Sequence, residues 1–89
     1  MTESAVPVHT PRFQRVLGAS DDLARGMSHR YVGVEHLFLA IIHDRLAVPT
    51  QVLGELIDLD AVEEALMAVM NSAGYNRGTA ELPRMEGDA

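Results

Sequence analysis

The stretch that decides the fold is residues 29–42, His-Arg-Tyr-Val-Gly-Val-Glu-His-Leu-Phe-Leu-Ala-Ile-Ile. It begins as a polar turn that contains Gly33 and continues as the most apolar run in the chain. Leu39 and Ala40 are apolar but lie off the main periodic face. That face is expected to consist of Val34, Leu37, Phe38, Ile41 and Ile42. A helix that is apolar most of the way round packs against several neighbours, so we predict that this is the central helix.

The first of three further helical segments begins at Thr10-Pro11. A hydroxyl N-cap followed by proline at the first helical position is a typical helix start. From there apolar residues repeat every three to four positions until Met27, and Gly26 and Ser28 mark the end of the helix. The residues expected on its inner face are Phe13, Val16, Leu17, Ser20, Leu23, Ala24 and Met27.

Two shorter helices follow the central one. The segment 48–56 tolerates Pro49 only in its first turn, and its apolar side is predicted to hold Val48, Val52, Leu53 and Leu56. Asp58 or Asp60 is expected to cap the last helix, whose periodic residues are Val62, Ala65, Leu66, Val69 and Met70. The sequence has no strand-like alternation. We therefore predict an all-α fold, a compact bundle of four helices with short connections.

The chain is divided by composition into one domain and two tails. Residues 1–9 are predicted to be a flexible N-terminal tail, 10–73 a single helical domain, and 74–89 a disordered C-terminal tail. A chain of 89 residues forms one domain with a small core. It contains no cysteine, so disulfides are excluded.

Charge and hydropathy restrict the partners. The net charge is −6, from thirteen acidic residues against seven arginines and no lysine. Nonspecific nucleic-acid binding needs a basic patch, so no nucleic-acid partner is expected. The longest apolar run, 37–42, is far shorter than the roughly 20 residues of a membrane span. The N-terminus also lacks the order of a signal peptide, so we expect a cytoplasmic protein without a membrane partner.

No catalytic constellation is readable in the sequence. His36 and His43 can share one side of the central helix, and a metal site with Glu35 or Asp44 is one interpretation. The favoured interpretation is that His36 forms a local cap or hydrogen bond and that His43 lies at the solvated helix end. Adjacent helical residues point about 100° apart, so Glu35 and His36 are not a catalytic dyad. We predict no enzyme, no metal and no cofactor.

Two motifs resemble a known family. His9-Thr10-Pro11-Arg12 and residues 28–40, Ser-His-Arg-Tyr-Val-Gly-Val-Glu-His-Leu-Phe-Leu-Ala, are similar to the Clp repeat of the N-terminal domains of Clp-type AAA+ unfoldases. The similarity continues without a gap to about Met70. The sequence departs from the family in having Val34 for threonine and Ser28 for glycine. These 89 residues hold one repeat where the family has two in tandem, and they contain no recognisable ATPase module.

The resemblance implies a recognition module. In the unfoldases this domain binds substrates and adaptors, and some members recognise phosphorylated arginine. The implied partner-binding residues are His9, Thr10, Val34 and Glu35, at the starts of the first two helices. A helix N-terminus offers N–H groups to anions, and a carboxylate pairs with a guanidinium. For Glu35 the alternative is simple stabilisation of the helix dipole, and Val34 removes one polar group from the phosphoarginine site.

These observations predict a stand-alone Clp repeat that binds a protein or peptide: an unfoldase, an adaptor or a substrate. It would act as an adaptor, competitor or regulator of Clp-dependent proteolysis. The alternative is a sequestering protein that binds a small molecule or peptide aimed at the unfoldase. A homodimer is expected, because a single repeat exposes the surface that its tandem twin would cover.

Overall fold

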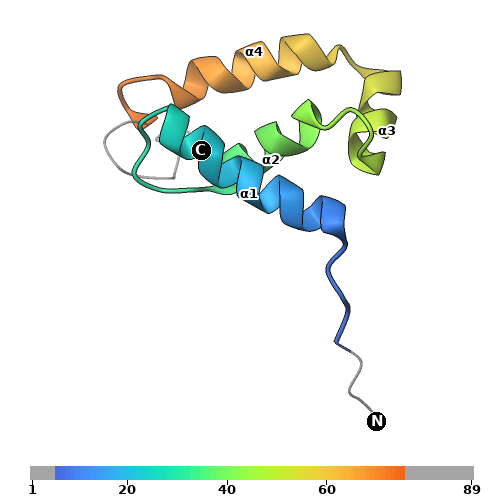
Figure 1. Ribbon diagram of the computed structural model, residues 1–89. Coiled ribbons are helices and arrows are strands. Elements are labelled where there is room, and N and C mark those ends of the chain that lie inside the picture. Colours follow the sequence, from blue (N-terminus) through green and yellow to red (C-terminus); the bar gives the residue numbers. More distant parts are fainter. Residues whose placement is uncertain (1–5, 76–89) are drawn as a thin grey trace.

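A computed structural model of the protein describes residues 6–75 (Figure 1). These residues form four helices and no strand. The helices are α1 (Pro11–Gly26), α2 (Val34–His43), α3 (Val48–Leu56) and α4 (Leu59–Met70). The predicted all-α bundle of four helices is therefore confirmed.

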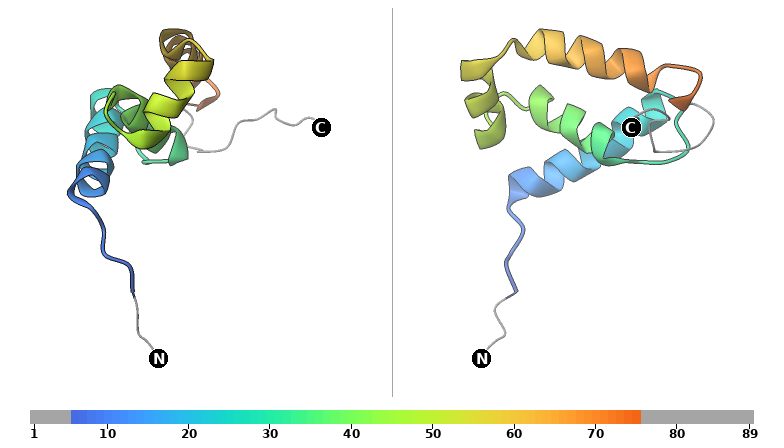
Figure 2. Two further views of the ribbon diagram at one scale, coloured as in Figure 1. Left: turned by 90° about the vertical axis from the view of Figure 1, so that its right-hand side faces the viewer. Right: turned by 180° about the vertical axis from the view of Figure 1, so that it is seen from behind.

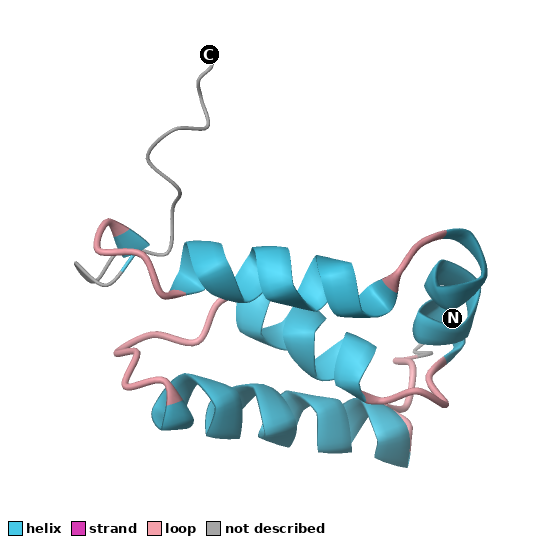
Figure 3. Cartoon of the chain, turned by 90° about the horizontal axis from the view of Figure 1, so that it is seen from above, coloured by secondary structure: helices cyan, strands magenta, loops and turns pink. Residues whose placement is uncertain are grey.

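The second helix is the centre of the bundle. Figure 3 shows α2 lying between α1 and α4, with α3 closing one end, and α2 contacts each of the other three helices. The two views of Figure 2 show the same arrangement, with the N-terminal segment running away from the helices. This confirms that the apolar stretch beginning at Val34 forms the central helix.

Local capping signals set the helix boundaries. The backbone N–H of Phe13 donates to Thr10 Oγ1 at 3.1 Å, with Pro11 in the first helical position. Asp58, rather than Asp60, caps α4 by accepting from the N–H groups of residues 60 and 61. Each of these bonds satisfies an N–H that the helix itself leaves without a partner.

The end of α1 is closed by a reversed turn at Ser28. The N–H of Ser28 donates to the carbonyl of Arg25, and the N–H of His29 to the carbonyl of Ala24. This is the Schellman pattern, and Ser28 has a φ of +61°, in the left-handed region that favours glycine. The turn therefore keeps the backbone conformation that glycine prefers, although serine stands where the related family has glycine.

Ser28→Gly is expected to stabilise the protein by about 1 kcal/mol, because it removes the steric cost of a left-handed Cβ. Chemical denaturation followed by circular dichroism measures the change. Ser72→Gly is the matched control, since the Ser72 hydroxyl bonds to the carbonyl of Val69 and glycine there loses that bond. A lower denaturation midpoint for Ser28→Gly would contradict the expectation.

The core lies mainly between α2 and α4. Leu39 and Ile42 from α2 meet Met70 at the end of α4 and Tyr75 just beyond it. Partly buried side chains from α1, its C-cap, α3 and α4 surround this cluster: Leu23, Met27, Leu53, Leu59, Val62, Leu66 and Met67. The small residues Ser20 and Ala24 are buried on α1. Small residues at a helix contact allow close approach, which fits the extensive contact between α1 and α2.

The predicted inner face of α2 is wrong in detail. Val34 is 78% exposed and Phe38 is 39% exposed, whereas Leu39 is fully buried. The buried residues of α2 are His36, Leu39, Ala40 and Ile42. The helix is rotated relative to the expected stripe. It is apolar nearly all round, so its periodicity does not select one face, and the packing of α1 and α4 makes the choice.

The apolar side predicted for α3 is also wrong, because most of its residues face solvent. Val48, Val52 and Leu56 are exposed, and Thr50 is the buried residue of the helix. The Thr50 hydroxyl donates to the carbonyl of Ile41 and so joins α3 to the last turn of α2. On α1 the expected inner residues Phe13 and Leu17 are likewise about 40% exposed. The pattern of α4 fits better, since Val62, Leu66 and Met70 face inward.

One residue of the predicted C-terminal tail packs in the core. Tyr75 is buried in the cluster with Leu39, Ile42 and Met70. Residues 6–9 lie in the predicted N-terminal tail, and they are exposed and carry no helix. The remainder of the two predicted tails, 1–5 and 76–89, lies outside the described residues.

Within residues 6–75, no single helix has the length and hydropathy of a membrane span. Together α2 and α3 reach that length and composition, but the chain bends by 80° between them.

Candidate functional site

The start of α1 holds the first two predicted binding residues. The Thr10 hydroxyl accepts the N–H of Phe13, and the His9 ring meets the Phe13 ring edge-on with 4.8 Å between centroids. Both residues are exposed. The hydroxyl of Thr10 is therefore used in the cap. Because Pro11 has no N–H and Gln14 donates to the Thr10 carbonyl, this first turn has few free backbone donors.

The two predicted halves of the binding site are not brought together. Nη1 of Arg12 bonds to both carboxylate oxygens of Asp44, at 2.7 and 2.8 Å. This ion pair places the start of α1 beside the end of α2, so the start of α2 lies a whole helix away. For ten residues at 1.5 Å each, that is about 15 Å. His9 and Thr10 therefore lie at the opposite end of α2 from Val34 and Glu35.

The start of α2 is organised by Gly33 and His36. The backbone N–H of Gly33 donates to Nδ1 of His36 at 2.9 Å, which is one half of a capping box. This confirms the interpretation of His36 as a local hydrogen-bonding residue. Val34, between them in sequence, points outward and is largely exposed.

Glu35 is half-buried and turns toward the segment after α4. Its carboxylate accepts the hydroxyl of Tyr75, forty residues further along the chain. The same carboxylate lies against Gly33, where an added Cβ would come within 2.7 Å of Oε2. Gly33 is thus required for the close approach of the Glu35 side chain. Since the bond to Tyr75 uses only Oε2, the second carboxylate oxygen is what Glu35 could offer to a partner in its predicted role.

We define the buried polar cluster as His29, Glu35, His36 and Tyr75, of which His36 and Tyr75 are buried and His29 and Glu35 are half-buried. Nδ1 of His29 lies 2.8 Å from Nε2 of His36. The rings of His29 and Tyr75 are in contact, with 4.8 Å between centroids. Through this cluster the turn before α2, the helix itself and the segment after α4 are joined.

The hydrogen bonds of the cluster fix where its protons lie. His36 accepts the Gly33 N–H on Nδ1, so its neutral ring carries the proton on Nε2 and donates it to Nδ1 of His29. His29 then carries its own proton on Nε2, a buried atom without a partner among the described residues. A second proton on either ring would place two donors face to face. The cluster is therefore complete only with both rings neutral.

Electrostatics favour the neutral ring of His36 and the protonated hydroxyl of Tyr75. Burial, and then the neighbouring His29, lower the pKa of His36 below its ordinary value of 6.5. Burial and the Glu35 carboxylate raise the pKa of Tyr75, so its hydroxyl keeps the proton that it donates. The cluster is built for structure at neutral pH, with no group positioned as a nucleophile.

A shallow apolar groove lies between α1 and α2, next to Val34. We call it the α1–α2 groove; its volume is about 410 Å³. It is lined by Leu17, Ser20, Asp21, Val32, Gly33, Val34 and Leu37. Phe13 and Phe38, both partly exposed, lie one turn further along the two helices. One of the predicted binding residues, Val34, therefore lines a concave apolar surface.

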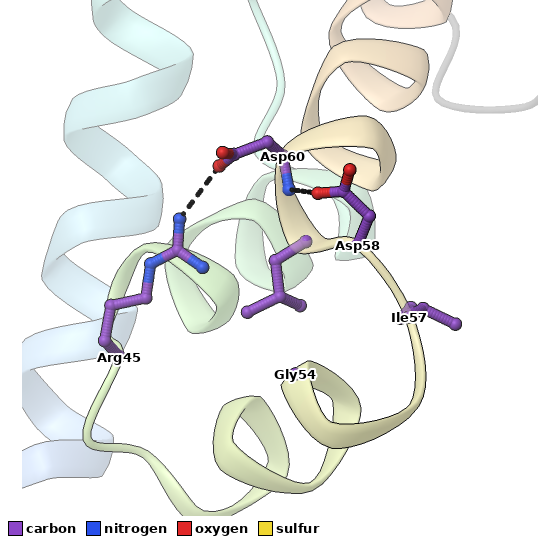
Figure 4. Close-up of a pocket in the computed structure, with 6 residues that line it drawn as sticks. Arg45, Gly54, Ile57, Asp58 and Asp60 are labelled. Carbon is purple, nitrogen blue, oxygen red and sulfur yellow. Dashed lines mark hydrogen bonds and ion pairs between the residues drawn. The ribbon is translucent and has the colours of Figure 1, made fainter.

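A second hollow, of about 410 Å³, lies between α3 and the start of α4. Figure 4 shows Arg45 reaching across it to Asp60, while Gly54 leaves its lower side without a side chain. Nη2 of Arg45 lies 3.2 Å from the Asp60 carboxylate. The polar groups that line this hollow are therefore bonded to one another, and they do not converge on a common point.

The metal interpretation gains no support within residues 6–75, which contain no group of three or more potential ligands placed to hold an ion. His36 faces His29, whereas His43 lies at the exposed end of α2 and contacts Glu63 at 2.9 Å. His36 and His43 therefore make separate contacts and do not face a common point.

Sequence reasoning missed Tyr75 and the contact between His29 and His36. Tyr75 follows a helix end and stands among polar residues and glycine, which is the composition of a tail. The only signal available was its aromatic ring, the last in the chain. Its partner Glu35 lies too far away in sequence for any local pattern to connect them.

Comparison with curated proteins finds relatives among large Clp proteins. The chain is 34% identical over 65 residues to the chaperone protein ClpB of Oceanobacillus iheyensis, covering 72% of this chain and 8% of the relative. The same figures hold for the negative regulator of genetic competence ClpC/MecB of Bacillus subtilis. A ClpA homologue, an ATP-binding subunit of the ATP-dependent Clp protease of Guillardia theta, is 39% identical over 62 residues, 68% of this chain and 8% of the relative.

The chain thus spans less than a tenth of the length of these relatives. No solved structure gives a significant match. A family model described as the Clp repeat (R) N-terminal domain matches residues 3–85. In Clp unfoldases such domains bind proteins or adaptors and are not catalytic. Since the match extends over almost the whole sequence, the chain belongs to the Clp repeat N-terminal domain family.

Proposed function

We propose that the protein is a non-catalytic recognition module that binds a protein or peptide segment in the α1–α2 groove. The observation that carries this proposal is the exposure of Val34 at the edge of an apolar groove, near the partly exposed rings of Phe13 and Phe38. Apolar side chains grouped on a surface mark a contact site for a partner. Membership of the Clp repeat family supports a protein as that partner.

Through this groove the protein would act in the cytoplasm as an adaptor, competitor or regulator of Clp-dependent proteolysis. The chain's similarity to a small part of large Clp proteins supports this role. A module that resembles the recognition part can occupy the same substrates or adaptors without supplying ATP hydrolysis. Sequestration of a small molecule or peptide aimed at the unfoldase is the alternative use of the same groove.

Phosphorylated arginine is the finer ligand that the family resemblance suggests. Its phosphate would meet N–H groups at the start of α2, and its guanidinium would pair with Glu35. Oε2 of Glu35 already accepts the Tyr75 hydroxyl, so only part of the carboxylate's acceptor capacity is left for a guanidinium. We expect phosphoarginine to bind more weakly than an apolar peptide. Titrating the protein with each ligand in turn, while following the amide chemical shifts of Thr10 and Glu35, measures the order of the two affinities.

A homodimer would use the same face. We define the α1–α2 face as Phe13, Leu17, Val34 and Phe38, all at least 39% exposed. The charges on these two helices are nearly balanced, because the arginines of α1 offset its aspartates. A second copy and a peptide would then compete for this face. Light scattering that finds only monomer at high micromolar concentration would contradict the dimer.

The test of the proposed function compares Val34→Asp with wild type in degradation by a purified Clp unfoldase and its peptidase. We expect the wild-type protein to change the degradation rate of a model substrate, and Val34→Asp to reduce that effect at least about tenfold. Ala68→Asp, an exposed change on α4, is the matched control. Tight small-molecule binding without any effect on degradation would favour sequestration instead.

A further inference from the structure

The outer side of α3 is an apolar stripe that the fold does not use. We define the α3 stripe as Val48, Val52 and Leu56, which are 71%, 54% and 74% exposed. Their spacing of four residues places them along one side of the helix. Thr50, on the opposite side, and Leu53, about a quarter turn away from the stripe, attach α3 to the rest of the protein. The stripe can therefore be changed without removing a core contact.

All the net charge of the described residues lies at the end of the molecule that carries α3. Between residues 45 and 64 there are five carboxylates and a single arginine. The other described residues carry four arginines and four carboxylates, which balance. Arg45 is itself bound to Asp60. The five carboxylates are Glu55, Asp58, Asp60, Glu63 and Glu64.

This charge distribution indicates which kind of partner can bind the α3 stripe. Two copies meeting through α3 would bring two acidic ends together, and the resulting repulsion opposes association. A partner with positive charges beside its apolar residues gains from the same field. Glu55 lies next to the stripe on α3, three residues after Val52, so it is placed to meet such a charge.

We propose that the α3 stripe docks an amphipathic helical segment of a partner protein that carries lysine or arginine along the edges of its apolar face. The apolar side chains of the segment lie on Val48, Val52 and Leu56, and its basic side chains face Glu55 and the other carboxylates. This surface is distinct from the α1–α2 groove, because the two lie at opposite ends of α2. A module with both surfaces can hold two protein segments at once.

The probe is a synthetic 18-residue amphipathic helix of leucine and lysine, compared with its leucine–glutamate counterpart of the same apolar pattern. We expect the lysine peptide to bind and to shift the amide resonances of residues 46–57. Its affinity should fall as salt rises, since charges at the surface are screened. The glutamate peptide should not bind. Equal binding of the two peptides, no binding of the lysine peptide, or shifts confined to the α1–α2 groove would overturn the proposal.

Variants locate the binding surface independently. The double change Val52→Ser with Leu56→Ser is expected to weaken binding of the lysine peptide at least tenfold, and Glu55→Gln severalfold. Val69→Ser changes an exposed valine near the end of α4, outside both proposed surfaces, and should leave the affinity unchanged. Circular dichroism checks that each variant is folded. If the double variant instead converts a dimer to a monomer in sedimentation, the stripe is a self-association surface and the proposal is wrong.

The peptide-binding test of the α3 stripe can fail or succeed independently of the degradation test of the proposed function. Loss of the effect on degradation in Val34→Asp with normal binding of the lysine peptide concerns the α1–α2 groove alone. Normal degradation with no peptide binding to α3 overturns only the α3 inference.

Discussion

Leu39→Ala is expected to lower the free energy of unfolding by about 3 kcal/mol. Leu39 is fully buried at the centre of the cluster formed with Ile42, Met70 and Tyr75. Truncation removes apolar contacts and leaves a cavity that the surrounding helices fill only partly. A small domain has about 5–15 kcal/mol of stability, so this loss is a large fraction of the total. Denaturation with urea, followed by circular dichroism, gives the measurement.

Phe38→Ala is the control that makes this prediction informative. Phe38 has the larger side chain and belongs to the stripe that periodicity predicts to be the core, yet it is 39% exposed. We expect it to cost only about 1 kcal/mol. If Phe38→Ala costs as much as Leu39→Ala, the orientation of α2 described above is wrong.

Lowering the pH is expected to destabilise the protein through the buried polar cluster. The pKa of His36 is lowered in the folded state, mainly by burial, so below about pH 6.5 the unfolded chain binds a proton more readily than the folded one. Stability contributed by the neutral ring is therefore present above pH 6.5 and is lost as the pH falls. The loss from this one proton is at most about 1.4 kcal/mol per pH unit. Urea denaturation at a series of pH values between 7 and 5 measures it.

His36→Gln should flatten this pH dependence, because it removes the titrating ring and keeps a side chain that can accept the Gly33 N–H. The starting stability of this variant will be lower, so the slope against pH is the relevant quantity. His43→Gln changes an exposed histidine on the same helix and is expected to keep most of the slope. A His36→Gln protein as acid-sensitive as wild type would show that the cluster does not control the pH response.

Local sequence signals predicted the helices well because each depends on neighbouring residues. Thr10-Pro11 begins α1, Gly33 precedes α2, and Asp58 caps α4, all as expected from the chemistry of helix ends. The identification of the second helix as the central one also followed from composition. A helix apolar on most sides needs several partners, and α2 contacts all three.

Which faces are buried was much less predictable. For α2 the apolar residues cover too much of the helix for periodicity to choose between Phe38 and Leu39. For α3 the true anchor is Thr50, a polar residue whose hydroxyl satisfies a carbonyl at the end of α2. No apolar pattern reveals such a contact, because it depends on the bend between two helices.

The candidate site was predictable by residue type but not by arrangement. Val34 and Glu35 are adjacent in sequence, yet Val34 borders the α1–α2 groove while Glu35 turns inward to Tyr75. His9 and Thr10 lie about 15 Å from them along α2, an estimate that follows from the ion pair between Arg12 and Asp44. Whether these residues contact a partner stays a prediction.

By itself the sequence determined the all-α class, the helix boundaries, the centrality of α2 and the family, because these depend on short-range chemistry and on motif residues near one another in the chain. The tertiary structure alone decided which faces of α2 and α3 remain exposed. It also joined Glu35 to Tyr75 across forty residues and paired His29 with His36. Such contacts arise when separate helices pack, and packing is set by the fit of whole surfaces, which no single segment of the chain encodes.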